Sequence, residues 1–301
     1  MKRKVVQQGP ATLMVSLPSA WVKKYNIKKG RELELEEQDG RIVIAIEKIP
    51  LFYKTIIDTK KIGKFNKNII SAAYQIGYDE VEVLFDDVRI LKQIQERLSD
   101  LIGFEIVDHG EHHCTIRSIS VISDMEFDKV LKRIFLMLIS MANDSLDAIE
   151  KQEFSRLKEI REMEATNNKL TDFCRRILTK TGYNDNKKTT IMYSLVHDIE
   201  KIADDYKHIC DYFYENKKTV GSDVLKIYKA VNDYLGIFYE LFYKFDMKKN
   251  ERMFDEGKAI IKEAYELFRK KSAEEQILLH HLINLTTKIY ELTLPFLQLN
   301  I

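Results

Sequence analysis

Residues 194–213 read SLVHDIEKIADDYKHICDYF, and their apolar spacing decides how the second half of the chain folds. Apolar side chains recur every three or four positions, as they do on one face of an α-helix. The members of this stripe are Leu195, Ile199, Ile202, Tyr206, Ile209 and Phe213. We expect the stripe to lie in a helical core, with the charged residues facing the other way.

The charged face of the same helix carries His197, Glu200, Asp204 and His208, which a turn of about 100° per residue places together. Two carboxylates and two imidazoles on one helix can coordinate a metal, because side chains four positions apart converge. The alternative is a solvated face, which any surface helix shows opposite its apolar stripe. The residue pattern alone leaves both interpretations open.

Helical patterning continues on both sides of this stretch. The chain has only 4 prolines and 11 glycines in 301 residues, and Leu, Ile, Lys and Glu are dense from about residue 124 onward. Ser272 and Glu275 form a capping box that restarts a helix. We predict helices over residues 124–152, 154–181, 188–216, 221–245, 248–270 and 273–298. Long helices with short turns predict two antiparallel three-helix units.

Residues 194–213 resemble the repeated helix of the PhoU family, whose motif is a Glu, three residues and then an Asp. Glu200 and Asp204 fall on that pair, and His208 stands where the family usually has Asn. In the family, paired three-helix bundles carry metal clusters on their outer faces through such motifs. The resemblance therefore implies a divalent or iron-type metal on the first helical repeat, held by Glu200, Asp204 and His208.

The preceding helix offers Glu164 as a further metal ligand, followed by Asn168 and Asp172 at intervals of four residues. The family tends to carry an acid where Asn168 stands, so this half of the site is weakened. When the second helical repeat is aligned on the first, Asn284 and Lys288 replace the acidic pair. A hard cation with oxygen ligands does not tolerate a lysine in its site, so we expect the second repeat to be structural.

The amino-terminal end of the chain is strongly basic. The first 31 residues contain no Asp or Glu, although the whole chain is balanced, with 48 Lys and Arg against 47 Asp and Glu. A local excess of cations indicates a segment that meets phosphate groups. The candidate DNA-binding residues are Arg3, Lys4, Lys23, Lys24, Lys28, Lys29 and Arg31.

Short β-strands and turns are predicted for residues 4–46. Runs of β-type residues at 4–7 and 12–17 are separated by Gly9 and Pro10, and Ser19 is a plausible N-cap of a short helix. An alternating hairpin follows, with its turn at Gly40. So small a β unit makes a poor core alone, and we expect it to be completed by dimerisation.

This segment resembles the swapped-hairpin AbrB/SpoVT/MazE-type DNA-binding module, through the order of its basic pair, Gly-centred turn, Leu-Pro strand end and IKKG before an acidic hairpin. In that family two chains interleave, and basic side chains on the paired surface grip DNA. The matching positions are Arg3, Lys4, Lys23 and Lys24. Lysines at 23 and 24 replace arginines of the family, which removes bidentate base contacts.

Residues 50–120 alternate between strand and helix patterns and predict a small α/β unit, with strands at 52–57, 80–85, 104–107 and 114–120 and helices at 64–75 and 90–102. His109, His112, His113 and Cys114 cluster here around Gly110. Because neighbouring strand residues point to opposite faces, we expect no site among them. The unit is interpreted as a spacer.

The composition limits the class of protein. Cys114, Cys174 and Cys210 are widely spaced and form no CxxC pair, which favours a reducing, cytoplasmic compartment. No apolar run approaches the roughly 18 residues that cross a bilayer, so no membrane insertion is expected. The chain also lacks a nucleophile elbow, a phosphate-binding glycine loop and HExxH, and we predict that it is not an enzyme.

These parts predict a mixed, multi-domain fold: an AbrB-like module at 1–48, an α/β linker at 50–120 and a PhoU-like helical domain at 122–301, with repeats at about 124–216 and 221–298. The arrangement resembles phosphate-uptake regulators common among archaea. It implies a homodimeric, DNA-binding regulator of phosphate uptake whose helical block senses phosphate status or contacts a transporter or sensor protein. The alternative is an accessory protein of phosphate transport that docks such a partner and uses its first module only to dimerise. An antitoxin-like role is a third possibility, which the long helical block disfavours.

Overall fold

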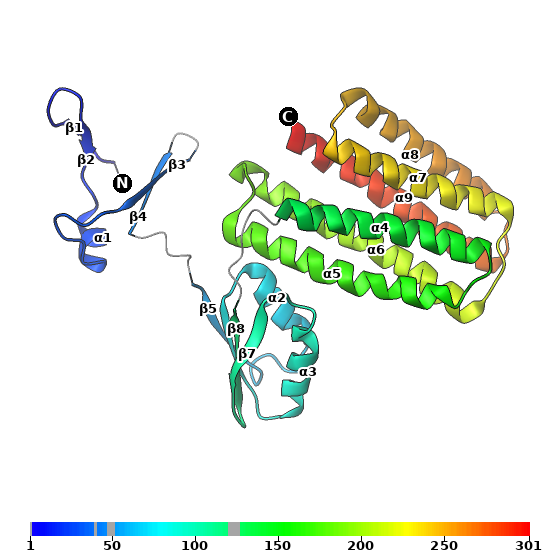
Figure 1. The fold of residues 1–301 in the computed structure, drawn as a ribbon, viewed down its shortest axis with the longest axis horizontal. Helices are drawn as coiled ribbons and strands as arrows, with labels where there is room; N and C mark the ends of the chain where they lie inside the picture. The colour runs from blue at the N-terminus through cyan, green and yellow to red at the C-terminus, as the bar shows by residue number, and fades with distance from the viewer. Residues whose placement is uncertain (1, 39–40, 47–51, 120–126) are drawn as a thin grey trace. The chain divides into compact units, whose positions relative to one another are not determined.

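The computed structural model describes residues 2–38, 41–46, 52–119 and 127–301 (Figure 1). The chain divides into two compact units, Met1–Phe52 and Tyr53–Ile301. The predicted α/β and helical regions both fall within the second unit. The predicted turn at Gly40 and the predicted helix start at Asp124 lie outside the described residues.

The first unit is built from two β-hairpins and one short helix, in the order that the sequence predicts (Figure 1). Strands β1 and β2 pair antiparallel with Val5 opposite Val15, and β3 and β4 pair with Leu35 opposite Ile44. Gly9 takes a φ of 77° in the first turn, which a residue without a Cβ adopts readily. The elements are β1 (Val5–Gln7), β2 (Leu13–Val15), α1 (Ser19–Lys24), β3 (Glu34–Gln38) and β4 (Arg41–Ala45).

The start of α1 differs from the prediction. Ser19 is the first helical residue, and Pro18 is the N-cap, with no side-chain capping hydrogen bond. The backbone of Pro18 is extended, at φ −62° and ψ 127°. The pyrrolidine ring fixes this φ at the residue before the helix. The helix therefore begins at Ser19 without a capping hydrogen bond from the Ser19 side chain.

The second unit begins with a four-stranded sheet in the order β5-β6-β8-β7. β5 and β6 are parallel, and β8 is antiparallel to both of its neighbours. Helices α2 and α3 lie on one face of this sheet (Figure 1). Val81 and Val83 of β6 are buried. The elements are β5 (Lys54–Asp58), α2 (Asn68–Ile76), β6 (Glu80–Leu84), α3 (Arg89–Leu98), β7 (Phe104–His109) and β8 (His113–Ser118). The predicted order of strands and helices is confirmed.

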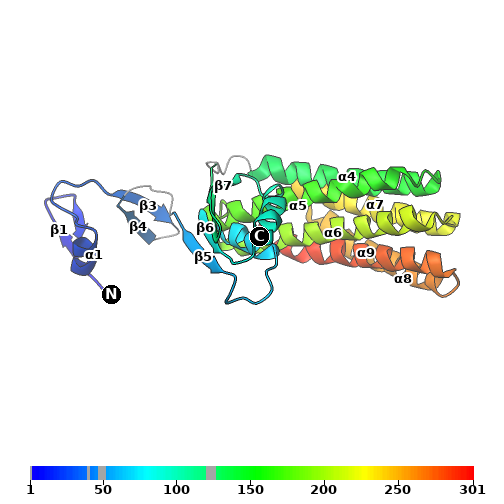
Figure 2. The ribbon, with the colours of Figure 1, turned by 90° about the horizontal axis from the view of Figure 1, so that it is seen from below.

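Long antiparallel helices make up the rest of the second unit (Figure 2). They confirm the helices predicted from the sequence, and every member of the apolar stripe in residues 194–213 is buried. Helices α4, α5 and α6 pack together, as do α7, α8 and α9, and the two sets meet through α6 with α9 and α4 with α7. The elements are α4 (Phe127–Glu150), α5 (Arg156–Thr181), α6 (Thr189–Asn216), α7 (Ser222–Tyr243), α8 (Met247–Phe268) and α9 (Ala273–Asn300). Within the described residues, none of these helices combines the length and apolar character that a bilayer crossing requires.

Candidate functional site

The basic residues that the sequence pattern assigns to DNA binding are all exposed. Arg3 and Lys4 precede β1, while Lys23 and Lys24 occupy the last turn of α1, where cations also complement the negative end of the helix dipole. The Arg31 side chain donates a hydrogen bond of 3.3 Å to the backbone oxygen of Tyr25. The exposed set is Arg3, Lys4, Lys23, Lys24, Lys28, Lys29 and Arg31. These cations are available to an anionic partner.

On α6, the acids of the Glu-and-Asp motif lie next to cationic side chains. Glu200 Oε2 accepts a hydrogen bond of 3.1 Å from Arg175 Nη1, and Asp204 Oδ2 lies 3.3 Å from Lys201 Nζ. Glu164 Oε1, on α5, lies 3.3 Å from Lys207 Nζ. Each predicted carboxylate ligand is thus already compensated by a side-chain charge.

This arrangement does not fit the metal that the PhoU resemblance implies. His208 lies beside Asp205 and His281 instead of joining Glu200 and Asp204. Among the described residues, the four predicted ligands do not form a group with converging donor atoms.

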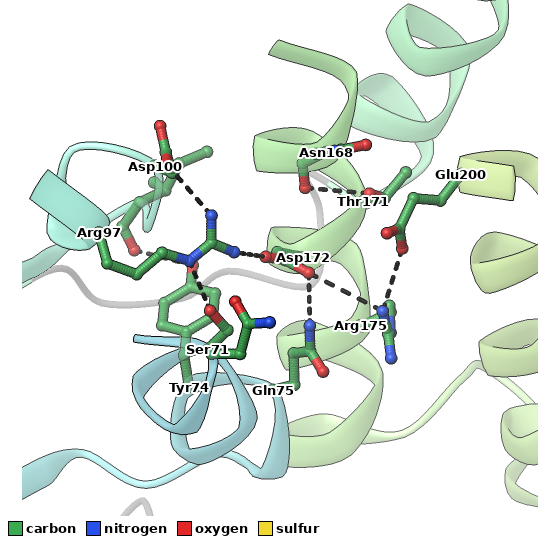
Figure 3. Close-up of polar contacts among 12 residues, drawn as sticks. Ser71, Tyr74, Gln75, Arg97, Asp100, Asn168, Thr171, Asp172, Arg175 and Glu200 are labelled. Atoms are coloured by element: carbon green, nitrogen blue, oxygen red, sulfur yellow. Dashed lines mark hydrogen bonds and ion pairs between the residues drawn. The ribbon is translucent and has the colours of Figure 1, made fainter. Parts of the chain in front are cut away.

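Asp172, the third polar residue of the α5 series, is buried and faces α2 and α3 (Figure 3). Its Oδ2 accepts a hydrogen bond of 3.0 Å from Arg97 Nη2, and its Oδ1 accepts one of 2.6 Å from Gln75 Nε2. Burial raises the pKa of Asp172, against the opposing influence of Gln75 and Arg97. Asp172 therefore serves a contact between the helices and the α/β region.

Arg176 forms the centre of the same contact, one turn further along α5. Its side chain has no exposed surface, and its Nη1 donates hydrogen bonds of 2.8 Å to the backbone oxygens of Tyr74 and Tyr78. Its Nη2 lies 3.1 Å from Asp79 Oδ1. The guanidinium carbon also lies 4.8 Å from the ring centres of Tyr74 and Phe104, a cation–π distance. Arg176 fixes the α/β region to α5.

Sequence reasoning did not single out Arg176. A signal was present, because Arg176 stands three residues after Phe173 and next to Ile177, both on the buried face of α5. A charged residue at apolar helical spacing indicates a buried polar contact. Its partners could not be identified, since Tyr74, Tyr78 and Asp79 lie about a hundred positions earlier.

The histidine-rich turn between β7 and β8 gathers no site among the described residues. His113 Nε2 lies 3.0 Å from Asp108 Oδ2, and His112 Nδ1 lies 4.0 Å from Asp86 Oδ1. Cys114 is buried, and burial raises the pKa of its thiol to about 11. Burial alternates along β8, where Cys114 and Ile116 are buried and their neighbours are not.

Comparisons with known proteins match both ends of the chain. A family model described as "Antidote-toxin recognition MazE, bacterial antitoxin" matches residues 6–51, and the PhoU domain model matches residues 131–213. The crystal structure of the phosphate transport system regulatory protein PhoU from Streptococcus pneumoniae is similar at 15% identity, over 58% of this chain and 94% of that one, with a TM-score of 0.47. A search of curated proteins finds no match.

The two matched segments are the ones that the sequence patterns identify, so both family resemblances are confirmed. The PhoU match covers α4 to α6 and ends before α7. The second repeat, which the PhoU match does not cover, has Asn284 and Lys288 in place of the acidic pair Glu200 and Asp204.

Proposed function

We propose that the chain is a cytoplasmic, DNA-binding transcriptional regulator of phosphate uptake, without enzymatic activity. The observation that carries this proposal is the match of residues 6–51 to an antitoxin-recognition family, in a segment where the side chains of Lys23, Lys24, Lys28, Lys29 and Arg31 are exposed. The PhoU domain match supports a link to phosphate transport. On this proposal, the helical block senses phosphate status or docks a transporter or sensor protein.

A homodimer is part of this proposal, and the apolar surface of the first unit supports it. No residue described between 2 and 46 is buried, although the strands there are largely apolar. Exposed apolar strands of this kind require a covering surface. A second copy of the chain would cover these strands with its own apolar strands, as in a swapped-hairpin dimer. The exposed apolar residues are Val5, Val6, Leu13, Met14, Val15, Leu35, Ile42, Val43 and Ile44.

The second candidate function is an accessory role in phosphate transport, in which the first module only joins two chains. The PhoU match favours this function by itself, because it does not require DNA. The two candidates differ in one measurable property, which is sequence-selective binding of a duplex by the exposed cations.

The decisive experiment measures binding of the full-length protein to its own upstream DNA and to a shuffled duplex, by fluorescence anisotropy between about 50 and 200 mM salt. We expect tighter binding to the upstream sequence and a steep loss of affinity with salt, because phosphate contacts release counterions. Absence of binding at the lowest salt would favour the accessory role.

Replacing Lys23 and Lys24 by Ala should weaken DNA binding and flatten its salt dependence, by roughly 1 in log–log slope for each phosphate contact removed. The matched control is Lys258→Ala with Lys262→Ala, which removes the same charge from exposed positions on α8. An unchanged slope in the Lys23 and Lys24 variant, or an equal change in the control, would contradict the assignment of DNA contacts to α1.

A further inference from the structure

A cluster of one carboxylate and two imidazoles bridges the helical repeats. Asp205 and His208 lie on α6, one turn apart, and His281 lies on α9, which packs against α6. One donor atom from each residue lies within 4.8 Å of the other two. We propose that Asp205, His208 and His281 bind a transition-metal dication of the zinc type, at a place distinct from the Glu200 and Asp204 pair.

The donor set selects the class of metal. Two imidazole nitrogens and one carboxylate oxygen suit zinc and its neighbours in the first transition series, while magnesium and calcium prefer oxygen ligands. Three protein ligands leave a coordination position for water or for a small anion. The exposed His208 gives the ion a path from solvent.

The distances are close to those that a bound ion requires. His281 Nδ1 lies 3.8 Å from Asp205 Oδ1, which is too long for a hydrogen bond. Ligands at about 2.0–2.1 Å from a tetrahedral zinc lie about 3.3 Å from one another, so a small side-chain adjustment suffices. His281 Nδ1 is also buried with no hydrogen-bond partner in the described structure, which a metal would provide.

Lys288 on α9 pairs with one oxygen of the Asp205 carboxylate and leaves the other oxygen for the proposed metal. Its Nζ lies 2.6 Å from Asp205 Oδ2 and 3.1 Å from the backbone oxygen of Lys201, which leaves Oδ1 directed at His281. Burial raises the pKa of Asp205, but His281 and Lys288 outweigh burial and keep that pKa below its usual value. Lys288 therefore leaves one oxygen of the Asp205 carboxylate for a metal.

Neighbouring residues provide matched controls. Asp204 is adjacent to Asp205 in sequence but pairs with Lys201, and His280 is adjacent to His281 but lies 3.1 Å from the Asn284 amide. Replacing these neighbours removes the same chemical groups from α6 and α9 without touching the proposed ligands.

The test titrates metal-stripped, untagged full-length protein with ZnCl2 by calorimetry and with CoCl2 by visible absorption. We expect one strong site per chain and cobalt bands typical of tetrahedral coordination. His208→Ala, His281→Ala and Asp205→Asn should each weaken zinc binding at least roughly tenfold, since loss of an outer partner alone has effects of that size. Asp204→Asn and His280→Ala should stay within about twofold of the unchanged protein.

His208→Ala is the variant least able to disturb folding, because this side chain is exposed, and circular dichroism checks the helix content of the others. The proposal is overturned if the unchanged protein binds no zinc, or if His208→Ala and His281→Ala leave binding intact. It is also overturned if Glu200→Gln and Asp204→Asn abolish binding, because the metal would then sit on the motif pair.

Discussion

At the scale of single residues, the buried guanidinium of Arg176 links the α/β region to the helices. Burying an arginine is costly unless its charge is compensated and its donors find acceptors. The backbone oxygens of Tyr74 and Tyr78, the Asp79 carboxylate and two aromatic rings contact the guanidinium, while its Nε has no hydrogen-bond partner in the described residues. Removing the guanidinium leaves the backbone oxygens of Tyr74 and Tyr78 without this donor, while Asp79 keeps its ion pair with Lys180.

Arg176→Ala should lower the free energy of unfolding of the second unit by at least about 1–3 kcal/mol, the usual cost of leaving a buried polar group without its partner, because two backbone oxygens lose their donor. The control is Arg161→Ala, which breaks an exposed pair with Asp211 and should cost less than about 1 kcal/mol. Urea unfolding followed by far-ultraviolet circular dichroism measures both. Equal effects of the two substitutions would show that the buried contact is not special.

The three thiols are predicted to be unreactive in the folded chain. Cys114, Cys174 and Cys210 have no exposed surface, and burial raises the pKa of all three, to about 11 for Cys114 and about 12 for Cys210. Near pH 8, a raised pKa leaves almost no thiolate, which is the reacting form. Mass spectrometry after iodoacetamide treatment should find no adduct on the folded protein and three on the urea-unfolded protein. Rapid labelling of the folded protein would contradict the burial of these residues.

At the scale of elements, the sequence predicts a helix start where it contains a capping motif. The capping box before α9 is present, with Ser272 Oγ accepting from the Glu275 backbone nitrogen and the Glu275 side chain accepting from the Ser272 backbone nitrogen. The start of α1 was not predicted correctly, because Pro18 and Ser19 are both plausible first residues and sequence gives no measure of backbone geometry.

Ser272→Ala should reduce the free energy of unfolding by about 1 kcal/mol, because the Glu275 backbone nitrogen loses its acceptor. Ser272→Asp should retain most of the stability, since Asp is an equally good cap. Ser222→Ala is the matched control, at the first residue of α7, where Gly221 is the N-cap and makes no side-chain capping bond. Thermal unfolding compares the three variants, and an effect at Ser222 as large as that at Ser272 would contradict the capping argument.

At the scale of the whole molecule, the sequence predicts which elements exist and which face of each is buried, but not which distant elements meet. Period-3.6 stripes identify the core of α6, and alternation identifies β6, because both signals are local. The contact of Asp172 with Arg97 and Gln75 joins segments far apart in the chain, which a local pattern does not encode. For the same reason, the sequence pattern does not show that Arg175 of α5 lies beside Glu200 of α6.

The division into two compact units leads to the last prediction. Residues 53–301 contain their own buried core, whereas the described residues 2–46 contain no buried side chain. A fragment of residues 53–301 should therefore keep the helix content and the thermal midpoint of the full chain, and should lose both DNA binding and dimerisation. Circular dichroism, anisotropy with the upstream duplex and sedimentation velocity measure these properties. If the fragment still binds DNA with the salt dependence of the full chain, the nucleic-acid surface lies on the second unit, and the exposed cations of the first unit serve another partner.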